Sequence, residues 1–411
     1  MIVAVSTEHR FDRTPDGRVW TSSSFAYPFW QRYLDVFDGV RVVARTRDVA
    51  AVPGSYLPAT GEGVHFACVP YFVGAWQYMR RAQQVRRAAR GAIGEDCAVI
   101  LRVASTIANT IYPVLRRKQR PYGVEVVGDP WDMFGPGVVD HPFRPLIRRL
   151  FTRRLKTQTR HAMAASYVTA QALQERYPAG SHALKANFSS ADIRAVVGVS
   201  DVELPSVAGT SRTFIREPQQ PLRVLFVGTL AQLYKAPDLL IDAVALCRRR
   251  GIRLHLTIVG DGGFRPQLEK QAKRLGIAQD VLFRGQLNAV GVREELMRAE
   301  LYVLPSHTEG LPRAMIEAMA VALPCIGSTV GGIPELLAGE DLVPPRDVNA
   351  LARKLEDVAR DPERMRRMSE RNLVKAQEYN EAVLHDRRVG FYKYVRERTE
   401  AWLVASKSSG Y

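Results

Sequence analysis

Short strands rich in Val and Ile alternate with helical patterns along most of this chain, and this alternation limits its fold more than any other feature. Val40–Ala44, Ala98–Val103 and Val124–Val127 have the length and composition of buried strands. The opening run Met1–Val5 is also typical of a strand, since it lacks the basic start and apolar length of a signal peptide. The pattern predicts an α/β fold built on parallel sheets.

A second series of strands and helices begins at Leu222, after the segment Gly198–Pro221, which has scattered Ser, Pro and Gly and no apolar period. The 411 residues exceed what one hydrophobic core usually organises, so we expect two domains. The predicted divisions are a first domain at 1–200, a linker at 201–221, a second domain at 222–385, and a terminal helix and tail at 386–411. The predicted strands of the second domain are Leu222–Val227, Leu254–Val259, Val281–Phe283 and Leu301–Leu304, with a helix from Pro237 to Arg250.

Composition excludes several classes of protein. No window holds the roughly 18 uninterrupted apolar residues of a membrane-spanning helix. The cysteines are far apart and have no CxxC spacing, which predicts free thiols in a reducing cytoplasm and neither a metal site nor a disulfide framework. They are Cys68, Cys97, Cys247 and Cys325.

Positive charge is concentrated in the first half of the chain. Residues 1–200 hold 27 Lys and Arg against 15 Asp and Glu, an excess of 12, whereas residues 201–411 hold 31 against 27, an excess of 4. A basic half indicates a polyanionic partner, which composition leaves open as nucleic acid, anionic lipid or a phosphorylated substrate.

The sharpest motif is the segment His307–Ala320, which directly follows a predicted strand. It is typical of a loop leading into a helix whose first turn holds Pro312. Backbone N–H groups at a helix start have no intrahelical partner, so those near Leu311 to Ala314 offer a site for a diphosphate.

Two carboxylates belong to this motif. Glu309 lies in the loop, and Glu317 lies eight positions further on, inside the predicted helix. We expect the two carboxylates to lie at different depths of one pocket. One would accept a charge-assisted hydrogen bond from a sugar hydroxyl and the other from a ribose. The alternative is that Glu317 pairs with Arg313 on an exposed helix face.

The spacing of Glu309 and Glu317 resembles the E-x7-E signature of family-4 glycosyltransferases, which are retaining enzymes with the GT-B fold of two Rossmann-like domains facing across a cleft. The resemblance covers about residues 222–345, and its motifs recur in the family's order. The further motifs are Val227–Ala236, with a glycine loop and a lysine, Ile258–Gly263, Phe283–Gly285 and Val330–Glu335.

The resemblance implies transfer of a hexose-type sugar from a nucleotide sugar, most commonly a UDP-sugar, to a glycan or lipid-linked acceptor in cell-surface polysaccharide or glycoconjugate synthesis. Configuration is retained, and neither a metal nor another cofactor is needed. The first domain would hold the acceptor, the second the donor, and the last helices would cross back to the first. The implied catalytic residues are Glu309, Lys235 and Asp129, and the implied donor-binding residues are Gly228, Thr229, Lys235, Arg284, Glu309, Gly310, Leu311, Pro312 and Glu317.

This chain departs from the family pattern in both halves. Thr229 stands where many relatives have an arginine, and the first domain lacks both the usual Gly-Gly and the usual central histidine. Val127–Asp132 occupies the histidine's place, where Asp129 either points at the reaction centre or forms an ordinary Asp-Pro loop. A non-catalytic module that binds a nucleotide sugar or a membrane stays open. A dehydrogenase is disfavoured, because Arg265 stands where G-x-G-x-x-G needs glycine.

An arginine-rich amphipathic helix is predicted at Phe143–Lys156, and Trp76–Arg90 is a second arginine-rich stretch. Either the apolar face packs inward and leaves the arginines exposed, or the helix lies on an anionic membrane. Since no nucleic-acid-binding motif accompanies the charge, we expect salt-sensitive peripheral docking at the inner face of the cell membrane and no nucleic acid partner. The predicted apolar face is Phe143, Leu146, Ile147, Leu150, Phe151 and Leu155, and the basic face is Arg144, Arg148, Arg149, Arg153, Arg154 and Lys156.

Overall fold

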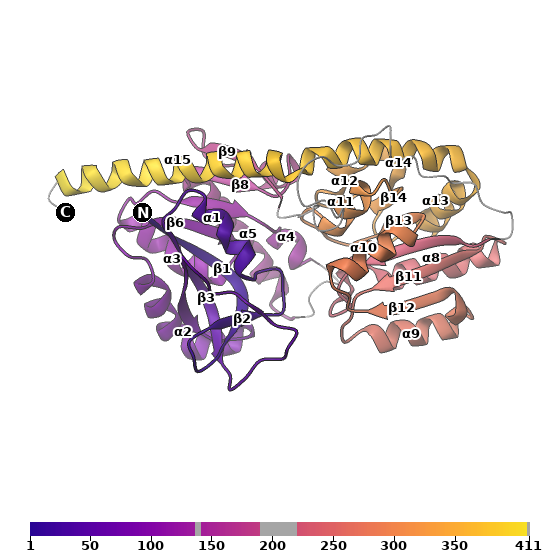
Figure 1. The fold of residues 1–411 in the computed structure, drawn as a ribbon, viewed down its shortest axis with the longest axis horizontal. Helices are drawn as coiled ribbons and strands as arrows, with labels where there is room; N and C mark the ends of the chain where they lie inside the picture. Colours follow the sequence, from indigo (N-terminus) through magenta and orange to yellow (C-terminus); the bar gives the residue numbers. More distant parts are fainter. Residues whose placement is uncertain (136–140, 190–219, 409–411) are drawn as a thin grey trace.

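The computed structural model describes residues 1–135, 141–189 and 220–408. These residues form two α/β domains that lie side by side, each built on a mainly parallel sheet (Figure 1). The linker predicted at 201–221 lies almost entirely outside the described residues.

The first sheet is parallel through the strands β5, β3, β1, β6, β7, β8 and β9, in that spatial order. Successive side chains of a strand point to opposite faces. Val3 and Val5 therefore join one core with Trp30, while Ala4 joins a second core with Ile107. The strands are β1 (Ile2–Arg13), β2 (Val19–Thr21), β3 (Gly39–Asp48), β4 (Leu57–Pro58), β5 (Val64–Pro70), β6 (Ala98–Val103), β7 (Gly123–Val126), β8 (Ala164–Tyr167) and β9 (Leu184–Asn187). The helices are α1 (Tyr27–Leu34), α2 (Gly74–Gly91), α3 (Thr106–Arg117), α4 (Pro130–Met133), α5 (Arg144–His161) and α6 (Ala172–Arg176).

Strand β1 is much longer than the predicted segment Met1–Val5. Its pairing with β3 shifts register between Ser6 and Arg10, and the two strands then continue together to Arg13 and Asp48. Strands β2 and β4 extend this end of the sheet in antiparallel fashion. A bulge of this kind redirects side chains, and bulges are common beside active sites.

The second sheet is entirely parallel, in the order β12, β11, β10, β13, β14, β15. Three of its strands coincide with the predicted ones, and the fourth, predicted at Val281–Phe283, continues to Gly285. The strands are β10 (Leu222–Val227), β11 (Leu254–Val259), β12 (Val281–Gly285), β13 (Leu301–Leu304), β14 (Cys325–Ser328) and β15 (Leu342–Val343). The helices are α8 (Pro237–Arg249), α9 (Arg265–Arg274), α10 (Ala289–Arg298), α11 (Arg313–Ala320), α12 (Ile333–Leu336), α13 (Val348–Arg360), α14 (Pro362–Ala376) and α15 (Glu381–Ser408).

The long helix α15 leaves the second domain and runs along the first, where it contacts β6, β8 and β9 (Figure 1). Its attachment centres on Glu125 of β7, which is 2% exposed. The Glu125 carboxylate accepts hydrogen bonds from the hydroxyls of Tyr33 (3.0 Å) and Tyr392 (3.1 Å), and it pairs with the buried guanidinium of Arg102. This buried polar cluster anchors α15, and Arg396 of the same helix adds an ion pair with Asp38 at 3.4 Å.

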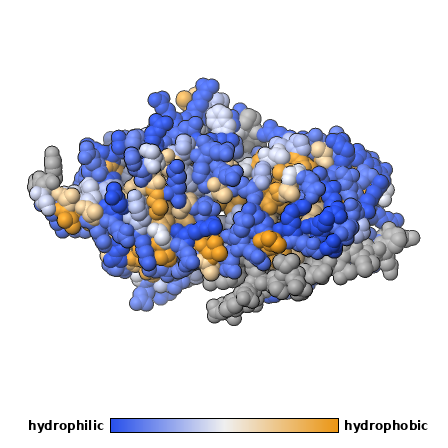
Figure 2. Space-filling view, turned by 90° about the horizontal axis from the view of Figure 1, so that it is seen from above, coloured by the Kyte–Doolittle hydropathy of each residue, from blue (hydrophilic) through white to orange (hydrophobic). Residues whose placement is uncertain are grey.

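Among the described residues, no helix is long and apolar enough to cross a membrane. The face in Figure 2 is largely hydrophilic, with apolar side chains gathered in small separate patches.

Replacing Glu125 by Ala should lower the melting temperature strongly, because Arg102 would stay buried without its carboxylate. Breaking a buried ion pair in this way costs about 3–5 kcal/mol. Tyr392→Phe is the control, since it removes one hydrogen bond worth about 1 kcal/mol. Melting followed by circular dichroism distinguishes the two, and a Glu125→Ala protein as stable as Tyr392→Phe would contradict this role.

Candidate active site

Most of the predicted donor residues come together at the carboxyl edge of the second sheet. Four loops meet there, after β10, β11, β13 and β14. Ligands of parallel α/β sheets bind outside the carboxyl ends of the strands, because the loops that follow neighbouring strands converge at that edge.

Glycines allow these loops to touch each other. A Cβ atom on Gly260 would lie 1.9 Å from the carbonyl oxygen of Gly228, and the φ of Gly260 is +134°. A Cβ atom on Gly331, whose φ is +53°, would lie 1.9 Å from the carbonyl oxygen of Glu309. Only glycine fits such contacts at such φ values, so the glycines of the sequence motifs pack the loops into one surface.

Lys235 and Glu309 form an ion pair at the centre of this surface. The Lys235 Nζ lies 2.7 Å from the Glu309 Oε1, and the two side chains are only 15% and 9% exposed. Ser306 Oγ donates to the same carboxylate oxygen at 3.0 Å. Burial lowers the pKa of Lys235, but the negative charge of Glu309 raises it, and the net effect is a pKa above the usual value. Lys235 is therefore a cation at neutral pH.

Glu317 lies half-buried on α11, near the buried Tyr302. Burial raises the pKa of Tyr302 well above its usual value, and the charges of nearby acidic groups, including Glu309 and Glu317, raise it further. The two carboxylates of the motif thus influence one hydroxyl. Helix α11 begins at Arg313, so Pro312 is the N-cap and not, as predicted, part of the first turn.

The site faces the first domain across several close contacts. Gly310 is close-packed, since a Cβ atom there would lie 3.4 Å from the carbonyl oxygen of Val127. Arg313 Nη1 donates to Ser24 Oγ at 3.3 Å. The carboxylate of Glu335 accepts the backbone N–H groups of Ala170 (2.5 Å), Gln171 (3.0 Å) and Ala172 (2.7 Å). The loops that carry most of the predicted donor residues therefore contact the first domain directly.

Three predicted site residues have other contacts. Arg284 pairs with Glu295 at 2.9 Å and lines a separate hollow of about 240 Å³. The carboxylate of Asp129 caps α4 through the N–H of Trp131 (2.8 Å) and binds Arg176 and the Tyr177 hydroxyl. Of the two alternatives for Asp129, these contacts fit the ordinary Asp-Pro loop and not a side chain that points at the reaction centre. Thr229 accepts the N–H of Ala231 at 3.1 Å and so shapes its own loop.

Three residues to which the motifs alone gave no role, Ser306, Tyr302 and Glu335, also lie at the site. Ser306 and Tyr302 belong to the strand and loop before Glu309, and Glu335 ends the motif that begins at Val330. The sequence offered one signal that could have found these three residues, namely that each is a polar residue beside a recognised motif. Within the described ranges, no group of three His, Cys, Asp or Glu side chains is arranged to hold a metal ion.

Two parallel α/β domains that face each other across such a site define the GT-B class of glycosyltransferase. Residues 209–373 match the model of the family described as glycosyl transferases group 1.

Similar proteins agree with this class. The chain is 25% identical over 335 residues to protein CapJ of Staphylococcus aureus, which covers 81% of this chain and 80% of CapJ. It is 37% identical over 163 residues to D-inositol 3-phosphate glycosyltransferase of Streptomyces avermitilis, but this match spans only 37% of the chain and 35% of that protein. The crystal structure of HepE from Anabaena in complex with UDP-glucose superposes with a TM-score of 0.62 at 16% identity, over 98% of this chain and 100% of HepE.

Gly260→Ala should destabilise the second domain, because the added Cβ atom meets backbone and the residue must keep a positive φ. Strain of this kind costs about 1–3 kcal/mol. Gly263→Ala in the same loop is the matched control, since a Cβ atom there meets nothing within 4 Å. Calorimetric melting measures both, and equal melting temperatures for the two variants would contradict the packing described.

Proposed function

We propose that this protein transfers a hexose-type sugar from a UDP-sugar to a glycan or lipid-linked acceptor, with retained configuration and without a metal. The observation that carries the proposal is the Lys235–Glu309 pair, set among glycine-packed loops that face the first domain. UDP is favoured because HepE, which shares the fold, was crystallised with UDP-glucose. We further propose a place for the reaction in cell-surface polysaccharide or glycoconjugate synthesis.

Each group has a definite task in this mechanism. The bond between the sugar C1 and the diphosphate oxygen breaks, and the electron pair leaves with the diphosphate. The acceptor hydroxyl oxygen bonds to C1 on the face that the diphosphate leaves, and its proton passes to a diphosphate oxygen. Lys235 and the N–H groups at the start of α11 stabilise the charge that builds on the diphosphate, and electrostatic stabilisation of this kind often contributes more to catalysis than any other effect. Glu309 orients the sugar, and Glu317 binds the ribose.

Lys235→Ala and Glu309→Ala should lower kcat more than they weaken donor binding, because their contacts strengthen as charge develops. Glu317→Ala should mainly weaken binding of UDP-glucose, by roughly tenfold for one charge-assisted hydrogen bond. Calorimetry gives the affinities, and slow hydrolysis of UDP-glucose in water gives the turnover.

Arg117→Ala is the control for these variants, since Arg117 is an exposed residue at the end of α3. Full hydrolysis by Lys235→Ala would refute the role of the pair. Binding of UDP-glucose without any hydrolysis by the wild type would favour a non-catalytic module instead.

We also propose that the first domain docks on the inner face of the cell membrane. The prediction that the apolar face of α5 packs inward is wrong near its start. Leu155 is buried, but Phe143, Leu146 and Leu150 are 64%, 65% and 41% exposed. Apolar side chains beside the exposed Arg149, Arg153 and Arg154 suit an anionic lipid surface, whereas Arg148 is half-buried and donates to the carbonyl oxygen of Trp131.

The protein should co-sediment with vesicles that contain phosphatidylglycerol at low salt and detach at high salt, because exposed charges are screened. A variant with Arg148, Arg149, Arg153 and Arg154 all changed to Gln should bind several-fold more weakly, since each arginine near an anionic surface contributes about 1 kcal/mol. Equal binding to neutral vesicles, or binding that salt does not affect, would contradict charge-driven docking.

A further inference from the structure

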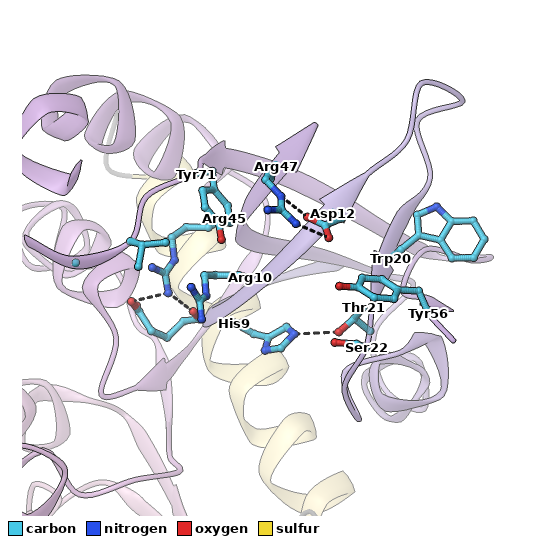
Figure 3. A pocket seen from close by; sticks show the side chains of 13 residues that line it. His9, Arg10, Asp12, Trp20, Thr21, Ser22, Arg45, Arg47, Tyr56 and Tyr71 are labelled. Carbon is cyan, nitrogen blue, oxygen red and sulfur yellow. Dashed lines mark hydrogen bonds and ion pairs between the residues drawn. The ribbon is translucent and has the colours of Figure 1, made fainter. Parts of the chain in front are cut away.

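A polar pocket of about 590 Å³ lies in the first domain, where β1 and β3 continue past the bulge. Strand β1 supplies Glu8, His9, Arg10 and Asp12, and β3 supplies Arg45 and Arg47. In Figure 3, Arg10 and Arg45 lie at one end of the pocket and Trp20 at the other, with His9 and Thr21 between them.

The charges in this pocket are unbalanced. Arg47 holds Asp12 through two hydrogen bonds of 2.9 and 3.0 Å. Arg45 pairs with Glu8 at 2.9 Å. Both carboxylates of the pocket are thereby engaged, and Arg10 is an exposed cation with no carboxylate partner in the described part of the chain.

Arg10 also lies near a second cation. Its charge acts on the buried guanidinium of Arg45, which is 7% exposed and whose Nε has no hydrogen-bond partner among the described residues. Burial lowers the pKa of His9 to about 4, with smaller effects from Arg10 and Arg45. His9 is thus neutral at physiological pH, and an anion near Arg10 would relieve the repulsion between two arginines.

The other end of the pocket suits a sugar ring. Trp20 and Tyr56 are half-buried and line this end of the pocket. Aromatic rings offer an apolar contact with a polar edge. Between the two ends, the hydroxyls of Thr21 and Ser22 line the wall, and His9 Nε2 is held by Thr21 Oγ1 at 2.9 Å. A few polar groups in an aromatic-lined hollow are typical of small-molecule sites.

The segment that forms one wall of the pocket also contacts the second domain. Thr21 and Ser22 are followed by Ser24, whose hydroxyl accepts the hydrogen bond from Arg313 at the start of α11. Helix α11 carries Glu317 and follows Glu309 in the chain. The segment that lines the pocket at Thr21 and Ser22 therefore also contacts the helix that carries Glu317.

We propose that this pocket binds the acceptor and selects sugars that carry a phosphate or a carboxylate, with the anion at Arg10 and the ring against Trp20 and Tyr56. The inference rests on the proposed glycosyl transfer, because it names the class of acceptor for that reaction. Arg10 makes the direct contact, and Arg45 adds to the positive potential.

Isothermal titration of the full chain at low salt with glucose 6-phosphate, glucuronate and glucose tests the proposal. At least one charged sugar should bind roughly tenfold more tightly than glucose, because a hydrogen bond to a charged group contributes about 1.5–3 kcal/mol. The two charged sugars distinguish a phosphate from a carboxylate. Arg10→Gln should abolish the preference, whereas Arg117→Gln, the same change on an exposed helix end, should keep it.

Equal affinity for all three sugars would overturn the inference. A preference that survives in Arg10→Gln, or that is lost equally in Arg117→Gln, would also overturn it. UDP-glucose is titrated into the wild type in parallel. Binding of UDP-glucose without a preference for charged sugars refutes this inference alone, and a preference that depends on Arg10 without UDP-glucose binding supports the pocket and refutes the proposed transfer.

Discussion

The buried carboxylate of Glu125 holds the two domains in their arrangement. It lies on a central strand of the first sheet and accepts hydrogen bonds from Tyr33 of α1 and Tyr392 of α15, while Arg102 neutralises its charge. A charge this deeply buried is tolerated only with such partners. Because α15 continues from the helices of the second domain, its attachment to the first sheet also sets how the two domains face each other.

The contact between the domains depends on this attachment and on close backbone packing. Glycines bring the loops of the second sheet into mutual contact, and Gly310 brings them against Val127 of the first domain. Within this narrow space, Lys235 and Glu309 neutralise each other at 2.7 Å, so two charged side chains stay in place at low exposure. Groups held in position before a ligand arrives need little reorganisation during a reaction.

The first domain departs from the family pattern in a way that the structure explains. Where a glycine loop would end the first strand, β1 continues through a bulge and stays paired with β3. Alternate residues of these two strands point to the same side, so the charged residues from Glu8 to Asp12 and from Arg45 to Arg47 gather in one pocket. The domain without the usual glycines thus has a polar hollow of its own.

The sequence by itself determined the parallel α/β class and three strands of the second sheet to the residue, because periodicity is a local property. The ion pair of Lys235 with Glu309 came from the structure. Only the tertiary structure decided the length of β1. The charged residues in its second half do not have the apolar pattern of a strand, and they form one only because they pair with β3. The tertiary structure also decided the pairing of Arg284 with Glu295, the exposure of Leu146, and the bond of Glu335 to Ala170, 165 residues away in the chain. Such contacts depend on how distant segments pack, and no local pattern encodes that packing.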